Sequence, residues 1–321
     1  MNKSTIFVGI DISKDVFDIY NSEEGHQQFT NDASGFNSLV KVLSASHWCV
    51  MEATACYHYR LALYLFENNI RVSVMNPLVI KRFIQMKLNQ VKTDKSDAKM
   101  ICLYGQQQEL QLWHPDPVYV EECKMLHTVA RLYFKQTTAI KNKLHALISK
   151  GHIKGKMIRS LKRQLRQIQK EIKLLETEME SLIRDHEPEL FTRITSIPGI
   201  GKKTAMLLII TTNSFKDFES SKQIASYLGL APNERTSGSS IRGRTRISKT
   251  GNPMLRSHLF LCSFTASIHN PQCKALYERI VAKGKSKKLA LIAVCNKLIK
   301  QAYGISKSGL PYDKSYVSKL S

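Results

Sequence analysis

Between residues 158 and 182, apolar side chains recur at alternating steps of three and four residues. The positions are Ile158, Leu161, Leu165, Ile168, Ile172, Leu175, Met179 and Leu182, with charged residues filling the other positions. This heptad pattern predicts a long α-helix whose apolar seam must be buried against another helix. Two partners remain open. An upstream helix of the same chain would give a helical hairpin, whereas a second copy would give a dimer or tetramer interface.

A second long helical segment is predicted upstream of this seam. Its apolar face consists of Leu126, Val129, Tyr133, Ile140, Leu144 and Leu147. The glycine- and lysine-containing segment 149–156 separates the two helices, and Pro188 ends the second. We therefore expect a helical coiled-coil region over residues 116–188.

The first 115 residues follow a different pattern, in which short apolar runs alternate with helical spacing. Strands are predicted at residues 6–12, 16–21, 26–31, 48–52 and 71–76, the first three as an antiparallel meander. Helices follow the third, fourth and fifth strands. This is the element order of a ribonuclease-H-like α/β domain, which we expect over residues 1–115. Residues 189–321 predict a mainly helical C-terminal domain with glycine-rich loops at 198–201, 236–243 and 304–309.

Charge is distributed unevenly along the chain. The protein has 48 Lys+Arg and 26 Asp+Glu, a formal net charge of +22, yet residues 1–110 contain 11 of each kind. The whole positive excess therefore lies in residues 111–321, which indicates a polyanion-binding surface, with nucleic acid as the first candidate. The seven cysteines are far apart and never form a C-x-x-C pair, which argues against a disulfide framework and a zinc site.

Four acidic residues in the electroneutral part are candidates for a metal site. Asp11 interrupts the first strand, Glu52 ends the fourth, and Asp94 and Asp97 share one face of a predicted helix in KTDKSDAK. The first and fourth strands are neighbours in a ribonuclease-H-like sheet, so these acids can converge. Crowded carboxylates suit Mg²⁺, and two such ions could clamp a phosphodiester. Taken singly, Asp11 could be structural and KTDKSDAK a solvated helix start capped by Thr93 or Asp94.

The segment TSIPGIGKKTAMLLI (195–209) predicts a helix-hairpin-helix. Gly199 and Gly201 would allow close approach of the backbone. The N–H groups that open the following helix would then face a phosphate, with Lys202 and Lys203 beside them. The alternative is an ordinary glycine turn between two helices.

The segment TSGSSIRGRTRIS (236–248) contains three serines and only basic charges, and Lys249 follows it. Its composition alone favours a mobile basic loop. Arg242, Arg244 and Arg246 could instead hold a phosphate, and a serine placed there could attack phosphorus if a base lay nearby. No local motif supplies that base, and the nearest histidine is His258.

These segments together resemble the DEDD transposases of bacterial insertion sequences and the related Piv-type DNA invertases. The similar blocks are GIDISKD (9–15), MEATACY (51–57), KTDKSDAK (92–99), SIPGIGKKTA (196–205), GLAPNERTSGSSIRGRTRISKTGNPMLR (229–256) and KLIKQAYGISKSGLPYD (297–313). They occur in the order of the family and span nearly the whole chain. Two positions depart from the family pattern. Ala55 replaces a common glycine, and Thr236 stands where an acidic residue is frequent.

The resemblance implies a RuvC-like N-terminal domain in which Asp11, Glu52, Asp94 and Asp97 bind Mg²⁺ or Mn²⁺. It implies that Ser237, in the C-terminal domain, attacks DNA and forms a covalent phosphoserine link before strand exchange. The active site would be shared between subunits of a dimer or tetramer. Insertion-sequence members use a structured non-coding bridge RNA, so the expected partners are double-stranded DNA and such an RNA. A membrane is not an expected partner, and we expect a cytoplasmic, nucleoid-associated bacterial protein.

The sequence therefore predicts a DNA recombinase or transposase, and three alternatives remain open. A Piv-type invertase would use the same site to invert a DNA segment. A RuvC-like junction nuclease would use the acids with an activated water and would leave the serine block without a role. A non-enzymatic architectural protein would need only the helix-hairpin-helix and the basic C-terminal half.

Overall fold

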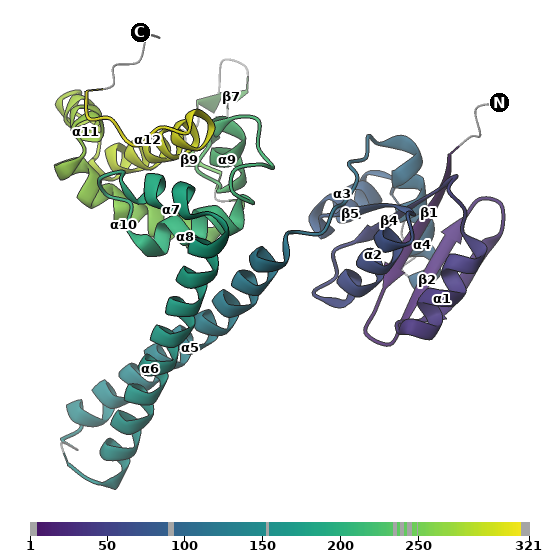
Figure 1. Cartoon of the computed structure of the whole chain (residues 1–321), viewed down its shortest axis with the longest axis horizontal. Helices are drawn as coiled ribbons and strands as arrows, with labels where there is room; N and C mark the ends of the chain where they lie inside the picture. The colour runs from purple at the N-terminus through teal and green to yellow at the C-terminus, as the bar shows by residue number, and fades with distance from the viewer. Residues whose placement is uncertain are drawn as a thin grey trace. The chain divides into compact units, whose positions relative to one another are not determined.

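The computed structural model of the protein describes residues 5–88, 93–151, 154–233, 236–237, 241–242, 246–248 and 250–315. Within these residues the chain forms twelve helices and one five-stranded sheet, together with two short two-stranded ladders. It divides into two compact units, Met1–Pro115 and Asp116–Ser321 (Figure 1). None of the described helices combines the length and apolar character needed to cross a membrane.

The N-terminal unit is built on the five-stranded sheet. Its strands are β1 (Ile6–Ile12), β2 (Val16–Asn21), β3 (Gly25–Thr30), β4 (His47–Glu52) and β5 (Arg71–Met75). Their spatial order is β3-β2-β1-β4-β5, in which β1 to β3 are antiparallel and β4 and β5 run parallel to β1. All five predicted strands are confirmed within one residue at each end. The predicted neighbourhood of the first and fourth strands is also confirmed.

Four helices complete this unit: α1 (Ala33–Val42), α2 (Tyr57–Glu67), α3 (Pro77–Met86) and α4 (Asp94–Gln107). Three of them begin at side-chain caps, because Asp32, Asn76 and Thr93 each accept a hydrogen bond from a backbone N–H of the first turn. Thr93 is thus the cap of α4, one of the two positions that the sequence allowed. Asp94 and Asp97 consequently both lie in the first turn of that helix.

A glycine in β1 allows α4 to lie directly on the sheet. A Cβ atom added at Gly9 would be 2.2 Å from both the carbonyl oxygen of Ala98 and the backbone nitrogen of Cys102. Both of these atoms belong to the backbone of α4, so no side chain larger than hydrogen fits without moving the helix. Gly9 and Asp11 point to the same face of β1, because residues two apart on a strand share a face. Gly9 therefore determines how closely α4 approaches the strand that carries Asp11.

We expect Gly9→Ala to lower the free energy of unfolding of the N-terminal unit by about 2–3 kcal/mol through overpacking. Trp48 and Trp113 are the only tryptophans of the chain, and both lie in this unit. Denaturant unfolding followed by tryptophan fluorescence therefore reports this unit selectively. Gly304→Ala is the control, since a Cβ atom there meets nothing within 4 Å. An unchanged tryptophan transition in Gly9→Ala would contradict the role given to Gly9.

The C-terminal unit begins with a long helical hairpin, formed by α5 (Val118–Ser149) and α6 (Lys156–His186), which lie side by side (Figure 1). All eight predicted seam positions of α6 are buried or half-buried. The seam packs against α5 of the same chain. On α5 the buried positions include Cys123, Ala130, Thr137 and Leu144, spaced seven apart. Val129, predicted on the apolar face, is 40% exposed, and the contact is made at these seven-residue positions instead.

Six further helices pack around the base of this hairpin: α7 (Pro188–Thr195), α8 (Lys202–Thr211), α9 (Ser221–Tyr227), α10 (Pro253–His269), α11 (Pro271–Ala282) and α12 (Lys287–Ser308). One buried core joins them to the hairpin and includes Cys123, Met179 and Ile183. The predicted loop at 304–309 is wrong, because α12 continues through Gly304. The helix ends only at Gly309, which adopts a left-handed conformation with φ +69°.

Candidate active site and nucleic-acid interface

Three of the four predicted acids are oriented by the packing of α4 on the sheet. Asp11 faces α4 from β1, and Glu52 lies on the same side at the end of β4, two residues beyond Val50. Val50 contacts this helix, because a Cβ atom added at Gly105 of α4 would lie 2.9 Å from Val50 Cγ2. Asp97, in the first turn of α4, is half-buried. The sheet and the helix thus bring these carboxylates to one end of β1 and β4.

Asp94 belongs to the same electrostatic group, although it is exposed. Burial of Asp11 raises the pKa of its carboxyl from 3.8 to about 6, together with repulsion by Asp97, Asp94, Glu52 and Asp18. Burial and Asp97 likewise raise the pKa of Glu52. The interactions that act on Asp11 all disfavour its charge, so a cation placed among these acids would be strongly favoured.

Asp18 is a fifth acid of this group, and the sequence reasoning did not identify it. It lies directly opposite Asp11 in the antiparallel β1–β2 pair, and it is 5% exposed. His26 Nε2 lies 2.7 Å from Asp18 Oδ1, and the amide of Gln28 donates to both carboxylate oxygens at 3.2 Å. These partners hold Asp18 in place beside Asp11. The available signal was an acid within a strand, in VFDIYN, of the same kind that singled out Asp11.

The donor set suits a hard divalent cation, because carboxylate oxygens are the ligands that Mg²⁺ prefers. In the described part of the chain, however, no three His, Cys, Asp or Glu side chains lie together as a metal ion would require. The acids share one electrostatic environment without forming a closed cage. The metal site therefore stays a prediction, supported by the crowded carboxylates and the raised pKa of Asp11.

The segment predicted as a helix-hairpin-helix contains the end of α7, a glycine-containing turn and most of α8. Gly199 has φ +106°, and an added Cβ atom would lie 2.7 Å from Ala266 Cβ of α10. Gly199 therefore serves both the turn and the packing of the turn on α10. Gly201 precedes α8, has open space around its Cα, and leaves the first turn of α8 without a side-chain cap. The first N–H groups of α8 are thus available to an anion, as in phosphate binding by helix N-termini.

Two glutamates of the hairpin pair with the lysines of this motif. Lys202 Nζ lies 2.9 Å from Glu180 Oε1, and Lys203 Nζ lies 2.7 Å from Glu176 Oε1. The hydrogen bond from Lys202, followed by that from Arg184, lowers the pKa of Glu180. Both lysine side chains remain more than half exposed, at 61% and 56%. The carboxylates of α6 therefore occupy positions beside these lysines where a phosphate of the DNA backbone would also bind.

We expect the double substitution Glu176→Gln and Glu180→Gln to increase affinity for non-specific duplex DNA about three- to tenfold, because two surface ion pairs no longer compete with phosphates. Fluorescence anisotropy with a labelled duplex at fixed salt would measure this. Glu178→Gln with Asp185→Asn removes the same charge from exposed positions of α6 that make no ion pair within the described residues. An equal gain in both variants would show that net charge, and not the pairing, causes the effect.

The serine and arginine block is only partly described. Thr236–Ser237 (β7) pairs with Ile241–Arg242 (β8), and Pro232–Asn233 (β6) pairs with Arg246–Ile247 (β9). The backbone of Ser237 thus lies in a short β-ladder, where the sequence predicted a loop. Arg246 is exposed. The side chains of Ser237 and Arg242 lie outside the described residues, as do Ser239, Ser240, Arg244 and Lys249. Ser237 belongs to the C-terminal unit and the four acids to the N-terminal unit.

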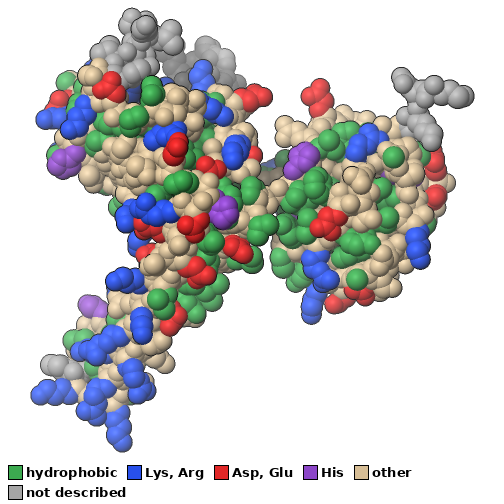
Figure 2. Space-filling model, viewed as in Figure 1, with side chains coloured by type: hydrophobic (Ala, Val, Ile, Leu, Met, Phe, Trp, Pro, Cys, Tyr) green, Lys and Arg blue, Asp and Glu red, His purple; other side chains and the backbone are tan. Residues whose placement is uncertain are grey.

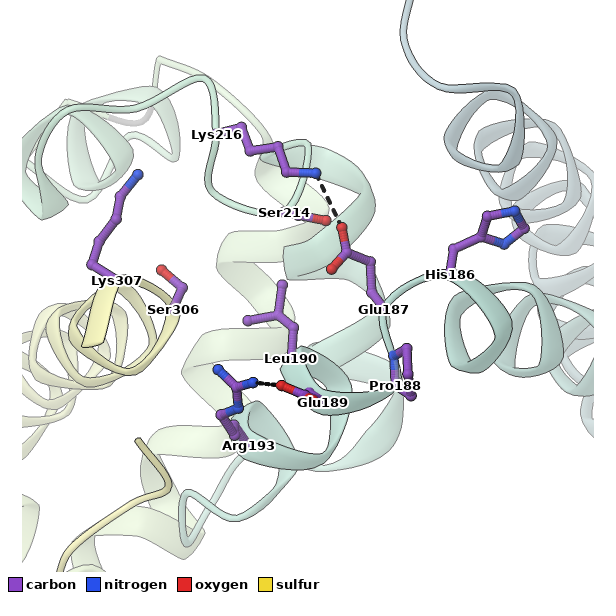
Figure 3. A pocket seen from close by; sticks show the side chains of 10 residues that line it. All are labelled: His186, Glu187, Pro188, Glu189, Leu190, Arg193, Ser214, Lys216, Ser306 and Lys307. Carbon is purple, nitrogen blue, oxygen red and sulfur yellow. Dashed lines mark hydrogen bonds and ion pairs between the residues drawn. The ribbon is translucent and has the colours of Figure 1, made fainter. Parts of the chain in front are cut away.

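A polar pocket of about 480 Å³ lies in the C-terminal unit, where the end of α6 meets α7, the turn before Lys216 and the end of α12 (Figure 3). Lys216 Nζ lies 3.2 Å from Glu187 Oε1, Arg193 pairs with Glu189, and Lys307 donates to the carbonyl oxygen of Phe215 at 3.1 Å. Each cation of the pocket thus has an internal partner. The network ties these elements together, and we assign it a structural role.

Comparison with known proteins matches two segments of the chain to transposase families. The family described as "Transposase" matches residues 8–153, which include the four acids. The "Transposase IS116/IS110/IS902 family" matches residues 191–278, which include the helix-hairpin-helix and the serine block. The pilin gene-inverting protein of Moraxella lacunata is 31% identical, over 97% of this chain and 98% of that protein.

The chain belongs to the IS110 family of transposases and DNA invertases. The transposase for insertion sequence element IS1111A of Coxiella burnetii is also similar, at 24% identity over 92% of this chain and 88% of that protein. The transposase for IS1328 of Yersinia enterocolitica is 24% identical over 89% of this chain and 95% of that protein. Members of the IS110 family are DNA recombination enzymes, and this protein is one of them. The alternative of a non-enzymatic architectural protein is thereby set aside.

Proposed function

We propose that this IS110-family protein cuts and rejoins DNA at a divalent-metal site through a covalent phosphoserine intermediate. Asp11, Glu52, Asp94 and Asp97 would hold Mg²⁺ or Mn²⁺, and Ser237 would be the nucleophile. The observation that carries the metal part is the convergence of these acids on Asp11, whose pKa is raised to about 6 by burial and mutual repulsion. The strand order β3-β2-β1-β4-β5 supports a RuvC-like arrangement of the N-terminal unit.

The chain's own residues supply distinct parts of this chemistry. The bound metal would supply positive charge against the scissile phosphate, which stabilises the charge that develops during displacement. Asp18, held by His26 and Gln28, would add its negative charge to the acids around Asp11 and would help to orient them from β2. The first turn of α8, with Lys202 and Lys203, would position the DNA backbone without reading its sequence. Arg242, Arg244, Arg246 and Lys249 would hold phosphates near the nucleophile.

We further propose three parts within the chain: residues 1–115 for metal binding, 116–188 as a helical region, and 189–321 for DNA binding and nucleophilic attack. The active site would combine the acids of one subunit with Ser237 of another, in a dimer or tetramer. A structured non-coding RNA encoded beside the gene would select the DNA sites.

DNA inversion is the second candidate, because the chain is 31% identical to the Moraxella pilin gene-inverting protein over almost the full length of both chains. The insertion-sequence transposases named above are similar at 24%. The two activities would use the same acids and the same serine, and they would differ in the arrangement of the DNA sites. Sequencing the nucleic acid that copurifies with the protein separates them: a single structured RNA encoded beside the gene supports transposition, and its absence supports inversion.

The proposed chemistry is tested by incubating the full chain with duplex DNA from the flanks of its own gene and with Mg²⁺. A denaturing gel should show DNA that migrates with the protein, because a phosphoserine link survives denaturation. EDTA should prevent formation of this species. Cleaved DNA without attached protein would instead support the junction nuclease, which uses an activated water.

A further inference from the structure

The hairpin carries an unusually one-sided charge. From residue 123 to residue 170 the sequence contains thirteen Lys+Arg and not one Asp or Glu. Lys124, at the base of the hairpin, pairs with Asp116 and Glu121. The other twelve lie between Arg131 and Lys170, and all of their side chains are exposed. We call residues 131–170 the distal hairpin.

Within the described residues, none of these twelve cations makes an ion pair. The acids of α6 begin only at Glu171, and Glu176 and Glu180 pair with the lysines that open α8. Figure 2 shows the same division, since the visible face of the far end of the hairpin carries Lys and Arg without Asp or Glu. The positive charge of the distal hairpin is therefore not balanced by the fold.

This arrangement is costly for an isolated hairpin. Arg159 and Arg163, Lys162 and Arg166, and Arg166 and Lys170 are pairs of like charge four residues apart on α6, which repel each other on the helix surface. Lys156 and Arg159 stand in the first turn of α6, where the helix dipole disfavours cations and where no acid offsets them. The apolar seam stabilises the hairpin against this repulsion, and a bound polyanion would relieve it.

The kind of polyanion is indicated by what the distal hairpin lacks. Apart from Tyr133 and Phe134 at its base, the distal hairpin contains no Phe, Tyr or Trp, so most of its length offers no ring on which an unpaired base could stack. Its cations are mostly lysines, which act as point charges toward phosphates. The span from Arg131 to Lys150 on α5 covers about 30 Å, comparable to about nine base pairs of duplex. These features suit the backbone of a double helix better than single-stranded nucleic acid.

We propose that the distal hairpin binds the phosphate backbone of duplex DNA, without reading its sequence, and is the main electrostatic contact of the protein with DNA. This contact is separate from the helix-hairpin-helix and from the serine and arginine block. The proposal rests on the proposed function in one respect: the choice of DNA follows from the recombination reaction. Binding in this way would place about one turn of duplex DNA along the distal hairpin.

The test compares two fourfold variants of the full chain. The hairpin variant carries Arg159→Gln, Lys162→Gln, Arg163→Gln and Arg166→Gln, and the control carries glutamine at Lys283, Lys285, Lys287 and Lys288, which are also exposed. Both variants have the same net charge, and glutamine keeps helix propensity on α6. Affinity for a labelled duplex of about three helical turns, of unrelated sequence and in EDTA, is measured against salt concentration.

The hairpin variant should bind at least about tenfold more weakly at about 0.1 M salt. The slope of its affinity against salt should become shallower by about 0.9 for each phosphate that the variant no longer neutralises. In the control variant the slope should change by less than this value. Equal changes in both variants, unchanged binding by the hairpin variant, or weaker binding seen only with a structured RNA would each overturn the proposal. Circular dichroism verifies that the hairpin still folds, and Lys141→Gln with Lys143→Gln on α5 provides a second variant with the same expected direction.

Failure of this proposal is distinguishable from failure of the proposed function, because the binding assay needs neither metal nor catalysis. A protein that binds duplex DNA through the distal hairpin but forms no covalent adduct would leave the hairpin proposal intact. A protein that forms the adduct, while its hairpin variant binds DNA normally, would contradict the hairpin proposal alone.

Discussion

Asp97→Asn is expected to reduce DNA strand cleavage about 100- to 1000-fold while it stabilises the N-terminal unit in the absence of metal. Cleavage falls because asparagine keeps the shape of the side chain but removes one of the charges proposed to hold the cation. Stability rises because Asp97 is the largest source of the repulsion that raises the pKa of both Asp11 and Glu52. Few structural substitutions change activity and stability in opposite directions, so the combination identifies a carboxylate that serves a cation.

The pH dependence supplies an internal control for this prediction. The pKa of Asp11 is raised in the folded chain, to about 6, so the folded state binds more protons than the unfolded chain between about pH 4 and 6. The free energy of unfolding therefore falls as the pH rises through this window. The stabilisation by Asp97→Asn should be present above about pH 6, where Asp11 is ionised, and should vanish below about pH 4. Denaturant unfolding in EDTA, followed by the fluorescence of Trp48 and Trp113, measures it.

Asp15→Asn is a matched control on the same unit, because Asp15 is exposed and does not act on Asp11. It should leave both cleavage and the unfolding transition unchanged. Undiminished cleavage by Asp97→Asn in Mg²⁺ would remove Asp97 from the metal site. Abolished cleavage together with lowered stability would show that Asp97 has a structural role instead.

Ser237→Ala is expected to abolish the covalent link between protein and DNA, with a decrease in adduct of about 1000-fold or more, because alanine has no oxygen that can attack phosphorus. The binding of DNA should change little, since other side chains hold the phosphates. The measurement is the protein-linked band on a denaturing gel, alongside anisotropy for binding. Ser237→Cys is a useful second variant, because its thiol keeps a nucleophile in place with altered reactivity.

The neighbouring serines are the natural controls for this experiment. Ser239→Ala and Ser240→Ala should each retain the adduct, because the resemblance to the family places the nucleophile at Ser237. An adduct that persists in Ser237→Ala but disappears in one of the other two would move the nucleophile within the block. Mixing Ser237→Ala with Asp97→Asn tests the shared site as well, since subunits that exchange would restore activity only if the acids and the serine come from different chains.

Much of the local structure was predictable from residue periodicity. The first strand of the N-terminal unit was visible as a β-branched apolar run, the second and third as a meander around a turn, and the seam of α6 as a heptad repeat. These signals depend only on residues within one segment, so the sequence alone is enough to predict the element. The break predicted at residues 304–309 failed, because Gly304 is tolerated in a helix whose other residues pack well. The prediction for Val129 failed for a related reason: three of the four contact positions spaced seven apart are Cys123, Ala130 and Thr137, small residues that carry little hydrophobic signal.

The candidate site was predictable only in part. Asp11 and Glu52 could be identified because burying an acid in an apolar strand costs free energy unless a partner offsets it. Asp18 has the same signal but was missed, since its importance depends on lying opposite Asp11 in the β1–β2 register. The pairing of Lys202 and Lys203 with Glu180 and Glu176 could not be predicted, because the residues are 22 and 27 positions apart and no local pattern links them.

The sequence by itself determined the strands and helices, the family, and the confinement of the positive charge to the C-terminal two thirds, because these depend on residue types and their spacing. Only the tertiary structure decided which faces meet. It placed α4 on β1 through Gly9, added Asp18 to the acids around Asp11, packed the seam of α6 against α5 of the same chain, and left the cations of the distal hairpin exposed. The physical reason is that packing partners are chosen by long-range fit and solvent exclusion, which residue spacing along one segment does not encode.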